Sequence, residues 1–208
     1  SLSDLASGDK VFDNAGVNTE GIKVIIGQTA TKIPSYLFAS QCISSVEFEG
    51  ESACESIGDY AFSNCASLSK IIIAESVTAI GDGTFSDCTR LSSITIPDSV
   101  TSIGPKAFYE CDNLTGITIP DSVTAVMQDA FGDCSSALYD LTTVDAVALV
   151  DGWIVGRDGA SDPATLNLGK ARGIVQAAFA HDRYLHTTIM RNNFYSALPH
   201  LAQRLYGV

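Results

Sequence analysis

A phenylalanine recurs every 23 residues through the middle of the chain, and a cysteine follows each one three residues later. The phenylalanines are Phe62, Phe85, Phe108 and Phe131, and the cysteines are Cys65, Cys88, Cys111 and Cys134. Apolar residues at a fixed period in the twenties predict a solenoid, in which each repeat forms one coil and stacks on the next. Because each coil contacts its neighbours, we expect one quasi-linear domain over all 208 residues.

An aliphatic residue lies five positions before each phenylalanine, and this spacing defines the frame of the coils. The pairs are Ile33/Phe38, Ile57/Phe62, Ile80/Phe85, Ile103/Phe108, Val126/Phe131 and Ile174/Phe179. The last interval is close to two periods, which indicates an insert. We therefore expect an N-terminal cap over 1–20, repeats over 21–140, an irregular insert over 141–173, and a last repeat with a C-terminal cap over 174–208.

A short alternating run in each repeat predicts a strand, as in Leu91-Ser-Ser-Ile-Thr-Ile96. Stacking aligns these strands as a parallel sheet on one face of the solenoid. The return segment 103–108 contains Pro105 and is too short for a long helix, so it predicts one helical or 3-10 turn. The expected fold is a horseshoe-like α/β solenoid of the leucine-rich-repeat type, mostly β, with coils of about 23 residues.

The insert carries the pattern of a β-hairpin. Two apolar runs, 147–150 and 153–155, flank Asp151-Gly152, and Asp-Gly between strands predicts a type I′ turn. Trp153 begins the second run. Its side chain is expected either to pack against the last coil or to contact a ligand.

Between successive cysteines the repeats read Cys-x-x-Leu-x-x-Ile-x-Ile-Pro-x-Ser-Val-Thr-x-Ile-Gly-x-x-Ala-Phe-x-x-Cys. This pattern resembles the BspA-like, or Treponema pallidum-type, leucine-rich repeat, and the resemblance covers more than half of the chain. It implies a secreted or surface-anchored protein of the kind found in bacteria and some protists. It also implies an adhesion or protein-interaction module that presents a rigid curved surface to a host matrix protein, another cell-surface protein or a glycan.

The charge of the chain narrows the classes of partner. Its formal net charge is −12 and its pI is about 4.4. Such a field repels nucleic acid and anionic membranes and favours basic partners. No apolar run is long enough to span a membrane. We expect a monomer that is extracellular or at the cell surface, with any targeting segment lying outside this chain, since neither a basic n-region nor an apolar h-region begins it.

The four periodic cysteines occupy one equivalent position, so their side chains point the same way and we expect free, buried thiols. Cys42 and Cys54 lie outside this ladder and are the candidates for a reactive or bridged pair. No Cys-x-x-Cys pattern supports zinc binding. His181, Asp182 and His186 lack a third ligand or a nucleophile, and no catalytic motif is present. We predict no enzyme activity, no cofactor and no metal.

The outward positions of the stacked strands remain as a binding surface. One predicted column holds Glu47, Ile72, Thr95 and Thr118, and the neighbouring column holds Ser45, Lys70, Ser93 and Gly116. The candidate contacts are Glu47, Lys70, Ile72, Thr95, Thr118 and, on the hairpin, Trp153. These positions favour an interaction module, and the alternative is a structural stalk of a larger surface protein.

Overall fold

The computed structural model describes residues 21–140, 147–157 and 172–174. The chain divides into two compact units, Ser1–Leu138 and Tyr139–Val208, which are considered separately below. The N-terminal cap expected over 1–20, and the last repeat and C-terminal cap expected over 174–208, lie outside the described residues apart from Ile174.

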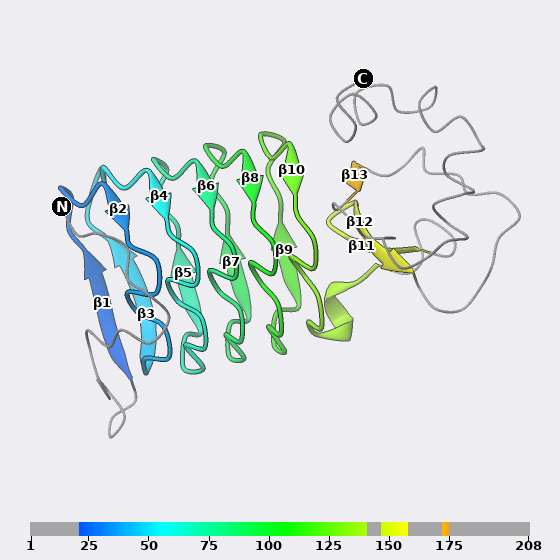
Figure 1. The fold of residues 1–208 in the computed structure, drawn as a ribbon, viewed down its shortest axis with the longest axis horizontal. Helices are drawn as coiled ribbons and strands as arrows, with labels where there is room; N and C mark the ends of the chain where they lie inside the picture. Colours follow the sequence, from blue (N-terminus) through cyan, green and yellow to red (C-terminus); the bar gives the residue numbers. More distant parts are fainter. Residues whose placement is uncertain (1–20, 141–146, 158–171, 175–208) are drawn as a thin grey trace, which may run out of the picture. The chain divides into compact units, whose positions relative to one another are not determined.

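The first unit is a stack of coils with a five-stranded parallel sheet along one face (Figure 1). Its strands follow one another in the order β1-β3-β5-β7-β9, so each coil contributes one strand. The bounds are β1 Ile22–Ile26, β3 Ile43–Phe48, β5 Lys70–Ile72, β7 Ser93–Thr95 and β9 Gly116–Thr118. The predicted mostly-β solenoid is thereby confirmed. We call the solvent-facing side of these five strands the sheet face.

A second five-stranded parallel sheet runs along the stack, and the repeat pattern did not predict it. Its strands contain two residues each: β2 Lys32–Ile33, β4 Ser56–Ile57, β6 Ala79–Ile80, β8 Ser102–Ile103 and β10 Ala125–Val126. In each, the second residue is buried and is the aliphatic residue that lies five positions before the phenylalanine. A two-residue strand has no recognisable alternation of its own and exists only because neighbouring coils pair with it.

The return segments form consecutive tight turns in place of the predicted helical turn. Two residues of each coil, two before and two after the phenylalanine, have the left-handed conformation, for example Lys106 and Glu110 with φ of 54° and 55°. The backbone between them bonds to the next coil: Lys106 N–H donates to Gln128, Phe108 to Ala130, and Glu110 to Gly132. These return segments, which we call the turn edge, therefore form a third ladder of hydrogen bonds along the stack.

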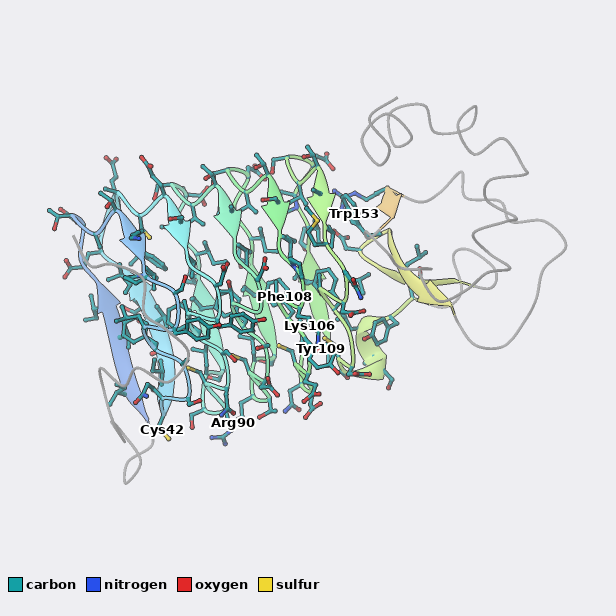
Figure 2. All side chains as sticks on the ribbon, in the orientation of Figure 1. Cys42, Arg90, Lys106, Phe108, Tyr109 and Trp153 are labelled. Atoms are coloured by element: carbon teal, nitrogen blue, oxygen red, sulfur yellow. The ribbon has the colours of Figure 1, made fainter. Side chains whose placement is uncertain are left out.

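A column of stacked phenylalanine rings fills the interior. Phe38, Phe62, Phe85, Phe108 and Phe131 follow one another with ring centroids 5.2, 5.6, 5.5 and 5.4 Å apart. All five rings are buried, and Phe62, Phe85 and Phe108 have no exposed surface. The predicted core spine is confirmed, and Figure 2 shows Phe108 within the stack of coils.

The described part of the second unit contains the predicted hairpin. β11 (Val147–Val150) pairs antiparallel with β12 (Trp153–Arg157), and β13 (Gly173–Ile174) pairs parallel with β12. Asp151 and Gly152 both have positive φ, 45° and 80°, as a type I′ turn requires. Arg172 supports the turn, because its guanidinium lies 2.7 Å from the Asp151 carboxylate. In the first unit, a short 3-10 helix, η1 (Ser136–Leu138), buries Leu138 after the last coil.

Candidate binding surface

The register of the sheet aligns its outward side chains in two columns. One column contains Lys23, Ser45, Lys70, Ser93 and Gly116. The other contains Ile25, Glu47, Ile72, Thr95 and Thr118. The predicted columns from the second coil onward are confirmed, and five of the proposed contacts share one surface. Their role as ligand contacts stays a prediction.

Two isoleucines on the sheet face are unusual because they are exposed, whereas large aliphatic side chains are usually buried. Ile25 is 55% exposed and Ile72 is 53% exposed, and no other large hydrophobic side chain of the described residues is as open to solvent. They lie on either side of Glu47 in one column. Lys23 and Glu47 form an ion pair with a 2.6 Å separation. This part of the face thus combines apolar and charged groups.

The remainder of the sheet face is small and neutral. Ser93, Thr95, Gly116 and Thr118 are all exposed and add no ring, charge or long aliphatic chain. The potential anchors are therefore concentrated on the first three strands of the sheet.

Sequence reasoning missed Lys23 and Ile25. The first coil lacks the regular 23-residue spacing, so the repeat pattern did not predict its strand, β1. A signal was present, because Val24-Ile-Ile26 precedes the apolar run Val46-Glu-Phe48 by 22 residues and pairs with it in the structure.

The larger aromatic side chains considered next are not part of the five strands of the sheet face. Trp153 is only 5% exposed, and its indole N–H has no hydrogen-bond partner. Tyr36 and Tyr60 stack on the turn edge with ring centroids 5.1 Å apart. Tyr109 lies on the same edge, where the Lys106 ammonium sits 4.8 Å from its ring centre (Figure 2). The stacking and cation–π contacts indicate that these tyrosines support the turns.

The periodic cysteines form the expected ladder of free thiols. Each thiol donates a hydrogen bond to the backbone oxygen of the phenylalanine in the preceding coil, over 3.0–3.2 Å: Cys65 to Phe38, Cys88 to Phe62, Cys111 to Phe85 and Cys134 to Phe108. Burial raises the pKa of the Cys65 thiol to about 12 and also raises the pKa values of Cys88 and Cys111. Because thiolate is the reactive form, these cysteines are suited to packing and not to redox chemistry.

We expect alkylation to distinguish Cys42 from the three buried thiols of the ladder, Cys65, Cys88 and Cys111. Cys42 is partly exposed, whereas Cys65, Cys88 and Cys111 are buried. Brief treatment of the native chain with iodoacetamide at pH 8 should modify Cys42 first, and the three buried thiols should react only after unfolding in urea. Peptide mass spectrometry measures each site separately. Rapid native labelling of Cys88 would contradict the proposed packing.

Carboxyl groups gather on the turn edge because positions 23 residues apart become neighbours. Asp87, Glu110 and Asp133 occupy equivalent positions two residues after a phenylalanine. A hydrogen bond to the Asp87 carboxyl raises the pKa of Glu110, and burial and the charge of Asp87 act in the same direction. Tyr109 donates a 2.6 Å hydrogen bond to Asp133, which raises the pKa of Tyr109 to about 12.

Replacing Glu110 with glutamine is expected to stabilise the chain at neutral pH. Because the pKa of Glu110 is higher in the folded than in the unfolded chain, the protonated carboxyl stabilises the fold. This stabilisation is fully present below the unfolded pKa and is lost as the pH rises through the folded pKa. Glutamine keeps a hydrogen-bond donor without the negative charge. The melting temperature of Glu110→Gln should therefore exceed that of the parent at pH 7, and the difference should shrink towards pH 4. Glu75→Gln, an equal charge change at an exposed turn, controls for net charge.

The described residues contain no group of three or more histidine, cysteine or acidic side chains arranged to hold a metal ion. Within the same residues, no helix has the length and apolar character needed to cross a membrane. His181, Asp182 and His186 lie outside the described residues.

The leucine-rich repeats of this chain are similar to those of known proteins. The family model of the BspA type leucine rich repeat region matches residues 8–138 in 6 copies. No curated protein matches the chain significantly. Among solved structures, the leucine rich repeat protein TpLRR of T. pallidum is 26% identical, with a TM-score of 0.52, and the match covers 55% of this chain and 56% of that one.

Two further solved structures are similar over part of their length. The pneumococcal vaccine antigen PcpA is 20% identical, with a TM-score of 0.56, over 76% of this chain and 42% of that one. A leucine rich cell surface protein of Faecalibacterium prausnitzii is 29% identical, with a TM-score of 0.43, over 61% of this chain and 41% of that one. The chain thus spans between 41% and 56% of these three structures.

Proposed function

Because this chain belongs to the BspA-type leucine-rich-repeat family, we propose that it is an adhesion module of a bacterial cell surface that binds a protein partner through its sheet face. Repeat proteins of this family are generally binding modules, which supports the view that the chain is not an enzyme. The family resemblance supports the proposed surface location. The single observation that carries the choice of face is the pair of exposed isoleucines, Ile25 and Ile72, on one ordered column.

The sheet face is suited to binding because its shape is fixed by the stack. Every strand is hydrogen-bonded to a neighbour, and the inward residues Val46, Ile71 and Ile94 are buried. A preorganised surface loses little conformational entropy when a partner binds. The strong acidic excess disfavours self-association by charge repulsion, so the module is proposed to act as a monomer.

The test introduces two arginines on the sheet face, as Thr95→Arg/Thr118→Arg. Both threonines are exposed, so the variant should keep the parent's melting temperature. Adhesion of protein-coated beads to immobilised purified matrix proteins and to cells is expected to fall at least tenfold, because long charged side chains cover the face. The matched control is Thr78→Arg/Thr101→Arg. Both threonines are exposed and come immediately before β6 and β8 of the second sheet.

Unchanged adhesion of the Thr95→Arg/Thr118→Arg variant would overturn the sheet face as the binding surface. In that case the competing role, a stalk within a larger surface protein, would be favoured. Loss of adhesion in both double variants would indicate a general effect of added positive charge and would equally count against the proposal.

A further inference from the structure

Acidic side chains are numerous in the first unit and nearly absent from its sheet face. Residues 21–140 contain 15 acidic and 5 basic residues, yet only Glu47 of the acidic residues lies in one of the five strands. Glu47 is paired with Lys23. The acidic residues that give this part of the chain its negative potential therefore lie outside the strands, and that potential favours a cationic ligand.

One border carries acids in register with the coils. Glu75, Asp98 and Asp121 each come three residues after the last residue of β5, β7 or β9, and all three are exposed. Each occupies the same position of a turn, closed by a backbone hydrogen bond such as that from Val100 N–H to Pro97 O. Because the strands are parallel, these three turns lie at one edge of the sheet. We call them the acidic row.

The dimensions of the sheet face favour a narrow ligand. Five strands about 4.8 Å apart, presenting from about 10 Å of length for β5, β7 and β9 to about 20 Å for β3, give a footprint of roughly 320 Å². A stable interface between folded proteins requires about 800 Å² on each partner. The face alone therefore suits a single segment of chain that crosses the strands, and it is too small for a second copy of this solenoid.

The spacing of the two isoleucines specifies the form of that segment. Ile25 and Ile72 are two strands apart in one column, a separation of about 10 Å. Side chains at i and i+3 of a polyproline II segment point the same way about 9 Å apart, whereas same-side residues of a β-strand are about 7 or 13 Å apart. Such a segment keeps its backbone polar groups free, and Ser45, Ser93, Thr95 and Thr118 supply hydroxyl groups along its path.

We propose that the sheet face binds an extended, polyproline II-like basic segment of a partner protein. Two apolar side chains at i and i+3 pack on Ile25 and Ile72, and lysine or arginine residues that follow them face Asp98 and Asp121 in the acidic row. This inference rests on the proposed function, since it identifies the class of partner for the same face. Glycans fit less well, because polar sugars cannot match two isolated aliphatic anchors.

The test selects random dodecapeptides displayed on phage against the full chain and sequences the enriched clones. The expected clones carry two apolar residues three positions apart, with proline between or beside them and lysine or arginine afterwards. A synthetic peptide of the enriched sequence should bind at least tenfold more weakly to Ile25→Ser/Ile72→Ser. Its affinity for Asp98→Asn/Asp121→Asn should fall and become less sensitive to salt. Ala79→Ser/Ala125→Ser on the second sheet is the control and should bind like the parent.

Melting temperatures show that each variant is folded; Ile25, Ile72, Asp98 and Asp121 are exposed, and Ala79 and Ala125 are partly exposed. Clones with apolar residues seven apart, which indicate a helix, would overturn the proposal. So would clones without basic residues, equal binding to Ile25→Ser/Ile72→Ser, or no enrichment at all. If any of these occurs while Thr95→Arg/Thr118→Arg still abolishes adhesion, the proposed function stands and only this partner class is rejected.

Discussion

Replacing Phe108 with alanine is expected to lower the free energy of unfolding by about 3–5 kcal/mol. The Phe108 ring has no exposed surface and stacks between Phe85 and Phe131, with centroids 5.5 and 5.4 Å away. The neighbouring rings are held by their own coils and cannot close the cavity. In a repeat protein stability depends on contacts between adjacent units, so the loss should also weaken the cooperativity of the stack.

Urea unfolding followed by far-ultraviolet circular dichroism measures both effects for Phe108→Ala. A lower midpoint and a shallower or biphasic transition are expected. Phe38→Ala is the internal comparison, because Phe38 is 7% exposed whereas Phe108 has no exposed surface. It should lose less stability. A Phe108→Ala midpoint equal to that of the parent would show that the ring column is not the core spine.

Replacing Gly104 with alanine is expected to cost about 1–3 kcal/mol, the usual range for overpacking. A Cβ atom at Gly104 would lie 2.7 Å from Gly81 C and 2.8 Å from Asp82 N of the preceding coil. Both are backbone atoms within the stack and cannot rotate away. Gly58 and Gly81 occupy equivalent positions and would place a Cβ atom 2.5–3.0 Å from the atoms they face. Glycine at these three positions therefore allows the close approach to the preceding coil.

The matched control is Gly116→Ala, because no atom lies within 4 Å of the added Cβ. Gly116 is in β9 and is exposed, so its replacement should change the free energy of unfolding by less than about 0.5 kcal/mol or increase it slightly. Thermal unfolding of both variants makes the comparison, and equal melting temperatures would contradict the close-approach argument. The last coil departs from this pattern, because Met127 occupies the position equivalent to Gly104.

The interior of the solenoid could be predicted well because each coil repeats the same local solution. Phe85, Cys88 and Leu91 recur at fixed positions and all are buried. The hairpin was equally predictable, since a type I′ turn needs positive φ at both central residues and Asp-Gly between apolar runs is a preferred sequence for it. The outward columns followed from the period combined with strand alternation, which is why Ile72 and Thr95 were correctly placed side by side.

The same reasoning failed where structure depends on pairing between coils. The second sheet has two-residue strands such as Ser102–Ile103, which carry too little pattern to recognise. The short length of the return segment and its Pro105 predict a helical turn, and this prediction is wrong. In the structure its backbone groups bond to the next coil instead, an arrangement that left-handed residues such as Lys106 make possible.

The sequence by itself determined the period, the buried column and the family of this protein, because these depend on residues that recur at fixed intervals. Only the tertiary structure decided which different residues meet. Ile25 comes beside Glu47 because the first coil departs from the 23-residue spacing and pairs with the second coil in an irregular register. A repeat specifies what all coils share, whereas a binding surface depends on how the coils differ and on which differences become neighbours.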